Sequence, residues 1–309
     1  MSQFAHIPVM VAEALAALAP RSGGCYADGT IGGGGHAHAI LKASSPEGWL
    51  YGCDRDKAAV EAATEHLAEF KGRYEIRHEN FSELADWIGP NRCDGVLLDL
   101  GVSSAQLDQA DRGFSFQQDG PLDMRMDRRQ SLTAARLVNE TDADQLGRLF
   151  WQLGGEREAR RIARAIERER KLRAFETTGQ LAGLIERLIP RQGHRLHPAT
   201  RVFQALRLRV NEEMDLLPQA LVDIWTILKP GKRFAVITFH SLEDRAVKEF
   251  GRALARDYRF EGDVDVPELR QPKAPELKWV NRKAIQPSAD EIRENPRARS
   301  AHLRVMEKI

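Results

Sequence analysis

Residues 28–36 read Asp-Gly-Thr-Ile-Gly-Gly-Gly-Gly-His, and this stretch decides the fold of the chain. A short apolar run, Cys25–Ala27, comes before it and a helical pattern follows it. Glycines let the backbone turn tightly and approach a ligand with no Cβ in the way, and the first turn of a helix presents unpaired N–H groups. The stretch therefore predicts a strand, a ligand-binding turn and a helix that together form a nucleotide-type cofactor pocket.

Further strand patterns recur on both sides of a long interruption, separated by helical patterns. The expected strands are Cys25–Ala27, Trp49–Cys53, Tyr74–Arg77, Gly95–Leu100, Arg233–Phe239 and, more weakly, His302–Glu307. The expected helices include Ile7–Ala19, Lys57–Phe70 and Leu216–Leu228, the last followed by a break at Lys229-Pro230-Gly231. The segment Asp263–Ala274 reads as a loop. This βαβ rhythm predicts an α/β fold with a parallel sheet.

Three acids stand where parallel strands are expected to end. Asp28, Asp54 and Asp99 each close or follow one of these strands. In open α/β sheets ligands bind at the carboxyl ends of the strands, so the three carboxylates are expected to share one crevice. A purely structural alternative is that Asp28 and Asp99 only cap the turns that follow them.

Two cofactor classes compete for this crevice. Gly32–Ala37 satisfies the G-x-G-x-x-G/A pattern with Asp54 about 20 residues further on, which is a dinucleotide signature. A pyrophosphate beside Asp28 and Asp99 would meet like charges, whereas S-adenosylmethionine brings an ammonium and a sulfonium that carboxylates attract. The charges favour the methyl donor, with the glycine backbone against its methionine part, Asp54 on the ribose hydroxyls and Phe81 beside the adenine.

The segment between the two sets of strands has a different character. From Leu107 to Asn211 β-branched runs disappear and arginine-rich helical patterns replace them. We therefore expect a discontinuous α/β domain, residues 1–106 and 212–309, interrupted by an all-helical domain at 107–211 that recognises the substrate.

Composition narrows the class of protein. The 46 basic and 45 acidic residues nearly cancel, so a polyanionic partner must be held by a local patch. The three cysteines form no CxxC pair, which favours free thiols, a reducing compartment and no metal site. The apolar stretch Ile7–Ala19 is too short to cross a bilayer, which takes ~20 residues. A cytoplasmic protein with no membrane contact is expected.

One segment offers such a local patch. Arg157–Arg173 contains seven arginines and Lys171 against three glutamates, and five of the arginines recur at spacings of three and four. A basic helix face would neutralise RNA phosphates. The alternative is a solvated helix whose arginines pair with its own glutamates. His240 is expected either to contact the target base or to order its loop.

Along nearly its whole length the chain resembles the bacterial 16S rRNA cytosine-N4 methyltransferases, the MraW/RsmH family. Seven segments carry the resemblance: DGTIGGGGH from Asp28, DGVLLDLGVSSAQLD from Asp94, RGFSF from Arg112, GPLDMRMD from Gly120, HPATRVFQALRLRVN from His197, TFHSLEDRAVK from Thr238 and NPRARSAHLR from Asn295. The resemblance implies a class I, Rossmann-like S-adenosylmethionine-dependent methyltransferase fold with an inserted helical domain. It also implies a substrate, namely a cytosine in the decoding region, at the P site, of 16S rRNA in the small ribosomal subunit.

The resemblance further implies the cofactor contacts, which are Gly34, Gly35, His36, Asp54, Phe81, Asp99 and Gln106. It leaves the catalytic hydrogen-bond acceptor open, because Asp99-Leu100-Gly101-Val102 replaces the acid-Pro-Pro-aromatic pattern of other amino-methyltransferases. Asp99 is the candidate, and a role limited to cofactor binding is the equal alternative.

The sequence also allows other functions to be compared with this one. Methylation of cytosine C5 needs a thiolate, usually in a Pro-Cys context, and no cysteine follows a proline here. A nicotinamide-dependent oxidoreductase and a non-catalytic RNA-binding or assembly protein remain as alternatives. The sequence leaves the oligomeric state open, a homodimer included.

Overall fold

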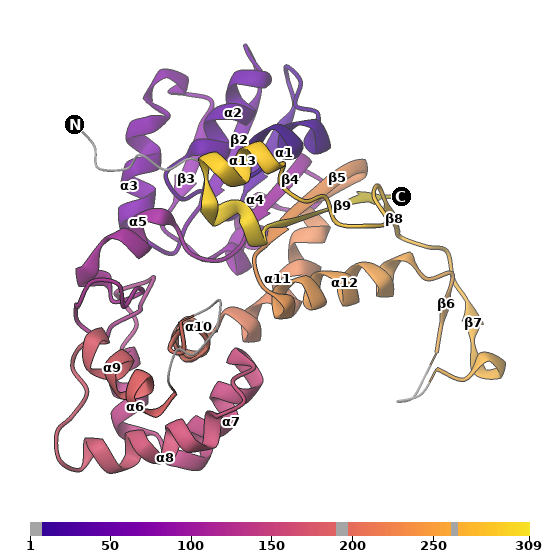
Figure 1. The fold of residues 1–309 in the computed structure, drawn as a ribbon. Helices are drawn as coiled ribbons and strands as arrows, with labels where there is room; N and C mark the ends of the chain where they lie inside the picture. The colour runs from indigo at the N-terminus through magenta and orange to yellow at the C-terminus, as the bar shows by residue number, and fades with distance from the viewer. Residues whose placement is uncertain (1–7, 190–196, 261–264) are drawn as a thin grey trace. The chain divides into compact units, whose positions relative to one another are not determined.

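The fold is that of a computed structural model, which describes residues 8–189, 197–260 and 265–309 (Figure 1). The chain divides into two compact units. One comprises Val102–Asp215, and the other is built from the chain up to Gly101 together with Leu216–Ile309. The sequence-based division places the boundaries at 107 and 211, and the assignment of a separate function to each part stays a prediction.

The second unit contains a seven-stranded sheet in the order β3-β2-β1-β4-β5-β9-β8. Its strands are β1 (Cys25–Asp28), β2 (Trp49–Cys53), β3 (Tyr74–Arg77), β4 (Cys93–Asp99), β5 (Leu228–Thr238), β8 (Leu277–Trp279) and β9 (His302–Lys308). The strands β3, β2, β1, β4 and β5 run parallel, and β9 is antiparallel to both β5 and β8. The predicted α/β class and parallel sheet are confirmed.

Helices cover this sheet because its central strands are almost entirely buried. Cys93 to Leu98 in β4 are all buried, which is the pattern of a strand covered on both faces. Helix α1 (Val11–Leu18) packs on β4, β5 and β9, while α12 (Ser241–Ala255) packs on β5, β8 and β9. The remaining helices of this unit are α2 (Gly35–Ala43), α3 (Lys57–His66), α4 (Leu84–Ile88), α13 (Ala289–Glu294) and most of α11 (Glu213–Ile227).

Three sequence-based expectations need correction here. The expected break at Lys229-Pro230-Gly231 lies inside β5. The pairing of β4 with β5 changes register between Cys93 and Gly95, and β5 has extra residues there. Gly231, at φ 72°, accommodates them. The first helix begins at Val11, and Ile7 lies outside the described residues. The segment expected as a loop from Asp263, whose first two residues lie outside the described ones, contains a short 3₁₀ turn, Pro267–Leu269, and β7 (Gln271–Pro272), which pairs with β6 (Tyr258–Arg259).

The first unit is built from α5 (Ser104–Asp108), α6 (Ala134–Glu140), α7 (Ala143–Gly154), α8 (Ala159–Arg170), α9 (Thr178–Leu188) and α10 (Thr200–Val210). Its core is a single cluster that includes Phe150, Ile162, Ile185 and Leu206, all fully buried. A separate cluster, with Ile40, Leu41, Leu50 and Leu97, lies in the other unit. Each unit therefore has an apolar core of its own. Within the described residues no helix is long and apolar enough to cross a membrane.

Candidate functional site

The three predicted acids lie at one edge of the sheet. Asp28 is the last residue of β1, Asp99 is the last residue of β4, and Asp54 directly follows β2. The strands β2, β1 and β4 are neighbours and run parallel, so their carboxyl ends meet. The sequence argument about this edge is confirmed by the topology.

Thr30 connects two of these acids. The Asp99 backbone N–H donates to Thr30 Oγ1 at 2.6 Å, and the Thr30 backbone N–H donates to Asp28 Oδ1 at 3.1 Å. The Gly29 N–H in turn donates to the Leu97 carbonyl at 3.1 Å. Asp28 thus also stabilises the turn after β1, as the structural alternative expected, and this turn holds the end of β4.

Asp54 fixes the glycine turn from the other side. Its Oδ2 accepts from the Gly32 N–H at 3.0 Å and its Oδ1 accepts from the Asp56 N–H at 2.8 Å. A carboxylate oxygen has more than one lone-pair site, so both oxygens retain capacity for a ligand hydroxyl.

The glycine turn ends in a helix start with no side-chain cap. Gly34 occupies the N-cap position of α2 at φ 81°, in the left-handed region that glycine tolerates. A Cβ at Gly34 would also come within 3.2 Å of Ala63 in α3. Gly35 begins α2, and no side chain caps the first N–H groups of that helix. These N–H groups are suited to an anionic ligand group such as a carboxylate.

Asp99 is the least compensated acid at this edge. Its Oδ1 is buried and has no hydrogen-bond partner within the described part of the chain. The buried His36 lies beside it, with its Nδ1 3.8 Å from Asp99 Oδ2. The other ring nitrogen of His36 lies 2.9 Å from the Val9 carbonyl, so the ring is held in a fixed orientation.

Burial perturbs all three carboxyls in the same direction. It raises the pKa of Asp28 to about 7, with the Asp54 charge adding to the shift and hydrogen bonds from Thr30 opposing it. Burial likewise raises the pKa of Asp54 to about 6 against the hydrogen bonds from Asp56 and Gly32. For Asp99, burial together with the charges of Asp28 and Glu243 raises the pKa well above the ordinary value. Such an edge favours a cationic ligand, which would stabilise the ionised carboxylates.

The other two predicted contacts occupy different positions. Phe81 begins a 3₁₀ turn, Phe81–Glu83, just after β3, and its side chain is half-buried. Gln106 lies in the other compact unit. It is buried, and its side chain accepts from the Ser103 N–H at 3.0 Å in the cap of α5. The cofactor roles of both residues stay predictions.

His240 orders the start of α12. Its Nδ1 accepts from the Glu243 N–H at 3.4 Å. The buried Glu243 carboxylate accepts from the backbone N–H groups of Phe239 at 2.8 Å and His240 at 3.2 Å. Glu243 Oε1 also lies 3.0 Å from His240 Nε2. The loop after β5 is thereby fixed, which matches the loop-ordering alternative for His240.

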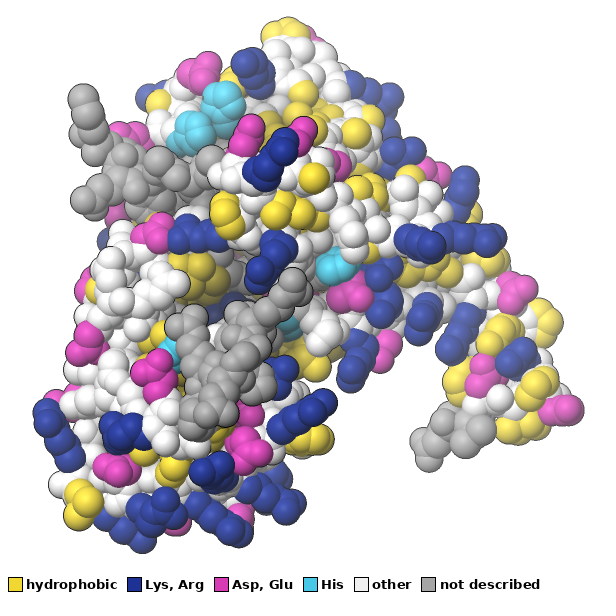
Figure 2. All heavy atoms as spheres, viewed as in Figure 1, with side chains coloured by type: hydrophobic (Ala, Val, Ile, Leu, Met, Phe, Trp, Pro, Cys, Tyr) yellow, Lys and Arg dark blue, Asp and Glu magenta, His cyan; other side chains and the backbone are white. Residues whose placement is uncertain are grey.

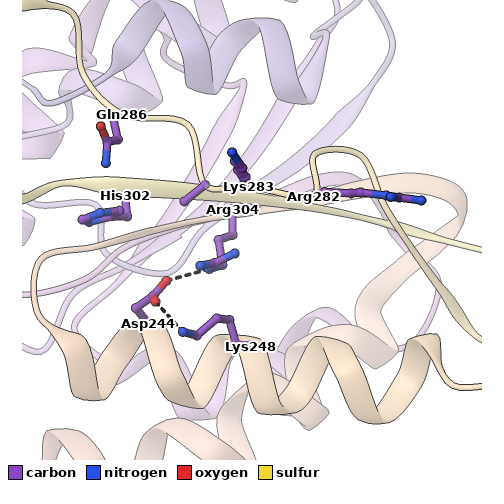
Figure 3. Close-up of a pocket in the computed structure, with 8 residues that line it drawn as sticks. Asp244, Lys248, Arg282, Lys283, Gln286, His302 and Arg304 are labelled. Atoms are coloured by element: carbon purple, nitrogen blue, oxygen red, sulfur yellow. Dashed lines mark hydrogen bonds and ion pairs between the residues drawn. The ribbon is translucent and has the colours of Figure 1, made fainter.

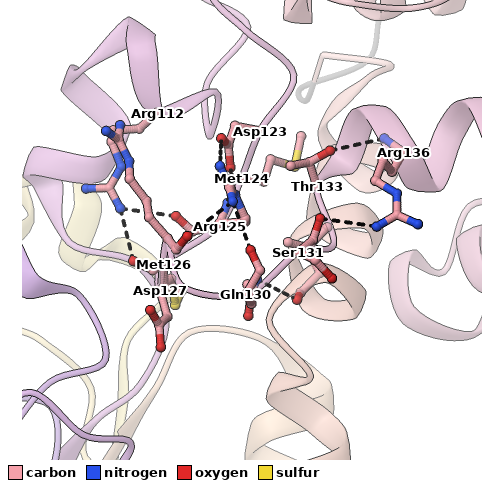
Figure 4. A network of polar contacts seen from close by, with 12 residues as sticks. Arg112, Asp123, Met124, Arg125, Met126, Asp127, Gln130, Ser131, Thr133 and Arg136 are labelled. Carbon is pink, nitrogen blue, oxygen red and sulfur yellow. Dashed lines mark hydrogen bonds and ion pairs between the residues drawn. The ribbon is translucent and has the colours of Figure 1, made fainter.

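A second polar network shapes the GPLDMRMD segment of the inserted unit (Figure 4). The buried Arg112 donates to the carbonyls of Arg125 at 3.1 Å and Met126 at 3.3 Å. Asn211 accepts from the Met126 N–H and donates to the Met124 carbonyl, both at 2.8 Å. Two segments far apart in sequence are thus joined through backbone groups, so much of this motif holds its own loop in place.

The arginine-rich segment forms α8 with one apolar and one basic face. Ile162, Ala163 and Ile166 are buried, whereas Arg160, Arg164 and Arg168 are exposed. Arg161 Nη1 lies 3.7 Å from Glu158 Oε2, an ion pair at the start of this helix. Arg157, Arg160, Arg164 and Arg168 have no such partner there. The alternative of an internally paired helix is therefore wrong for these four arginines.

Sequence reasoning missed two residues that shape the site. Thr30 was treated only as part of the glycine segment, and Glu243 only as part of TFHSLED. The signal for Thr30 is the Asp-x-Thr turn at the end of a strand. The signal for Glu243 is an acid three residues after an N-cap position, which is a capping-box spacing.

Comparison with known proteins covers the whole chain. The sequence profile of the MraW methylase family matches residues 3–309. The ribosomal RNA small subunit methyltransferase H of Citrifermentans bemidjiense is 50% identical over 314 residues, covering 100% of both chains. The protein of the same name from Symbiobacterium thermophilum is 47% identical over 311 residues, covering 99% of this chain and 97% of its own. A crystal structure of an rRNA methylase from Streptococcus thermophilus aligns over 97% of this chain and 92% of its own, at 11% identity and a TM-score of 0.43.

Proposed function

Because this chain belongs to the MraW methylase family, we propose that it transfers a methyl group from S-adenosylmethionine to the N4 amine of one cytosine in the decoding region, at the P site, of 16S rRNA. The observation that carries this proposal is the set of three carboxylates beside the glycine turn, the buried Asp28 and the half-buried Asp54 and Asp99, whose pKa values are all raised. When bound, S-adenosylmethionine supplies a methyl group activated by a positively charged sulfur. The carboxylates would attract that charge and the ammonium beside it.

The residues at this edge fit the parts of that cofactor. The uncapped start of α2 at Gly34 and Gly35 would accept its carboxylate, and Asp28 and Asp99 would face its cationic groups. Asp54 has lone pairs left for the two ribose hydroxyls. Phe81, just past β3, would stack on or pack against the adenine. His36 would hold the Asp99 side chain, while the Gln106 contact rests on the family resemblance alone.

The chemical difficulty lies in the cytosine amine, whose lone pair is delocalised into the ring. Holding the amine in line with the methyl group would supply much of the barrier lowering. An acceptor for an N4 proton would free the lone pair for attack. We propose Asp99 for this role, because its buried Oδ1 has no partner among the described residues and its raised pKa suits a proton acceptor.

Recognition of the RNA is proposed for the inserted unit. Arg160, Arg164 and Arg168 on α8, together with Arg157 just before it, are exposed and have no ion-pair partner among the described residues. Figure 2 shows Lys and Arg side chains gathered where Figure 1 draws α7 and α8. Such a face binds phosphates through charge and makes binding depend on salt. The same proposal puts the protein in the cytoplasm, where ribosomal subunits are assembled.

Transfer of labelled methyl from S-adenosylmethionine to purified small subunits and to bare rRNA tests the activity. The product nucleoside is then mapped in the RNA. We expect N4-methylcytidine at one position with the wild type, at least 100-fold slower formation with Asp99→Asn, and wild-type rates with Asp86→Asn, whose aspartate is exposed on α4.

Titration of Asp99→Asn with S-adenosylmethionine distinguishes a role of Asp99 in cofactor binding from a role in catalysis. If Asp99→Asn binds S-adenosylmethionine as tightly as the wild type but transfers slowly, the catalytic role holds. If affinity and rate fall together, Asp99 serves the cofactor. If the wild type binds the cofactor but transfers no methyl group to either RNA substrate, the protein is a non-catalytic RNA-binding protein and the proposed activity is wrong.

A further inference from the structure

A strongly basic hollow of about 610 Å³ lies in the sheet-containing unit. Three segments line it, namely α12, the loop after β8 and strand β9. Its charged and imidazole groups are Asp244, Lys248, Arg282, Lys283, His302 and Arg304. Four of these are cations, namely Lys248, Arg282, Lys283 and Arg304, one is the Asp244 carboxylate, and one is the His302 imidazole.

The single carboxylate in this hollow is already neutralised. Arg304 Nε donates to Asp244 Oδ1 at 2.6 Å, and Lys248 Nζ lies 3.1 Å from Asp244 Oδ2 (Figure 3). Although burial alone would raise the pKa of Asp244, these two cations lower it below the ordinary value. Asp244 is therefore ionised and oriented, and its role is to hold Arg304 and Lys248 in place.

The other two cations have no partner in the described chain. Arg282 and Lys283 are adjacent and exposed, and neither has an ion pair or hydrogen bond among the described residues. They lie on the same hollow as the Asp244 cluster. The hollow thus combines two fixed cations with two unpaired ones, an excess of positive charge that only an anion would balance.

Strand register places the hollow near the proposed site of methyl transfer. Asp99 in β4 is paired with Ile237 in β5, and Ile237 is paired with Leu303 in β9. His302, which lines the hollow, is one residue from Leu303. Two strand spacings amount to ~10 Å, so the hollow begins at the same edge of the sheet as the acids.

We propose that this hollow binds backbone phosphates of the RNA next to the nucleotide that is methylated. The proposal rests on the proposed function, since it assigns a second contact for the same substrate. The charge excludes S-adenosylmethionine as the occupant, because that cofactor carries cationic groups. The polar lining does not suit a stacked base, whereas lysine and arginine side chains are the usual ligands of phosphodiesters. An enzyme that acts on an extruded base needs such contacts to hold the flanking backbone.

The test measures binding of a labelled single-stranded RNA oligonucleotide by fluorescence anisotropy at several salt concentrations. The variant is Arg282→Gln with Lys283→Gln. Its matched control is Arg92→Gln with Lys71→Gln, which also removes one exposed arginine and one exposed lysine, but just before β4 and β3 at the opposite edge of the sheet. A second variant, Ala284→Glu, adds a negative charge to the lining of the hollow without removing a cation.

We expect the double variant to bind RNA roughly tenfold more weakly at low salt, with a salt slope smaller by about 1.4 for two lost phosphate contacts on a single strand. Ala284→Glu should weaken RNA binding as well. S-adenosylmethionine affinity should stay at the wild-type value in all variants, and the control should behave as the wild type.

Unchanged RNA affinity and salt slope in the double variant and in Ala284→Glu would overturn the proposal. If inorganic phosphate binds the wild type but not the double variant, and does not displace the RNA from the wild type at constant ionic strength, the hollow is a free-anion site and the proposal is also overturned. Failure of the proposed function is recognised separately, because the wild type would then transfer no methyl group to small subunits. If the wild type transfers methyl and the double variant keeps the same KM for subunits, the phosphate site alone is wrong.

Discussion

At the scale of single residues, the Asp28 carboxyl at the cofactor edge is buried and has a pKa of about 7. Between pH ~3.9 and pH ~7 the folded protein holds a proton on Asp28 that the unfolded chain, with a pKa of about 3.9, has lost. The contribution of Asp28 to the free energy of unfolding is therefore present below pH ~4 and is lost as pH rises through about 7.

Cofactor binding should show the opposite trend with pH. A cationic ligand favours ionised Asp28, and an α-amino group stays protonated up to pH ~7.5. We expect S-adenosylmethionine affinity to rise by about tenfold between pH 6 and pH 7.5, with proton release on binding. Calorimetric titration in buffers of different ionisation enthalpy measures both quantities. Asp28→Asn should flatten the profile, and an equally steep profile in that variant would assign the titration to another group.

Thr30 gives a second prediction at the residue scale. Thr30→Val keeps the shape of the side chain but removes the acceptor of the Asp99 N–H. We expect a loss of about 1–3 kcal/mol in the free energy of unfolding, together with weaker cofactor binding, because the end of β4 loses its connection to β1. Chemical unfolding and titration measure these effects. Thr64→Val is the control, since the exposed Thr64 hydroxyl only donates to the Val60 carbonyl. Equal effects in both variants would contradict the proposed connection.

At the scale of elements, the glycine turn and α2 depend on the backbone conformation of Gly34. Gly34→Ala would combine a left-handed φ of 81° with a Cβ only 3.2 Å from Ala63. Gly72→Ala has a similar φ of 87° but no atom within 4 Å of the new Cβ. Both variants should lose about 1 kcal/mol of stability from strain. Only Gly34→Ala should also weaken S-adenosylmethionine binding, as titration would show. Equal cofactor affinity in both variants would mean that the turn tolerates displacement.

Helix α8 allows a test of RNA recognition by the inserted unit. Replacing Arg160, Arg164 and Arg168 by glutamine removes three exposed charges that have no ion-pair partner among the described residues. We expect the salt slope of RNA binding to fall by about 2, at ~0.7 per phosphate contact on a single strand. Filter binding between ~50 and ~200 mM salt measures the slope. The control is Arg136→Gln, whose arginine is paired with Glu140 in α6. A slope unchanged in the triple variant would assign RNA binding to other residues.

Helices and strands with a clear periodic pattern of apolar residues could be predicted from the sequence. Strands that form only by pairing with another segment could not. The strands β2 and β3 and the acids at the carboxyl edge follow from alternation and from turn residues in the sequence. The short strands β6, β7 and β8 exist because another segment of the chain supplies their hydrogen bonds, and two or three residues carry no pattern of their own. Glu243 does carry a local signal, its capping-box spacing, whereas the bond from the Asp99 N–H to Thr30 depends on a strand 69 residues further along the chain.

At the scale of the whole molecule, the two separate cores predict that a core mutation destabilises only the unit in which it lies. Phe150 is fully buried in the core of the inserted unit, and Leu41 is fully buried in the core of the sheet-containing unit. Phe150→Ala and Leu41→Ala should each cost about 3–5 kcal/mol in the stability of their own unit. We expect Leu41→Ala to weaken S-adenosylmethionine binding and Phe150→Ala to leave it unchanged at low temperature. Loss of cofactor binding in Phe150→Ala would show that the units fold as one.

The position of the insertion also has a consequence for synthesis of the chain. The neighbouring strands β4 and β5 are separated by the whole of Val102–Asp215. At the usual rates of translation, the interval between the appearance of Asp99 and that of Leu228 is on the order of 10 s. During this time the nascent chain carries a half-built sheet with an open β4 edge, while the helical unit already has its complete core. A ribosome that stalls in this interval would leave the β4 edge unpaired for longer. The rate of translation therefore affects how safely this protein folds.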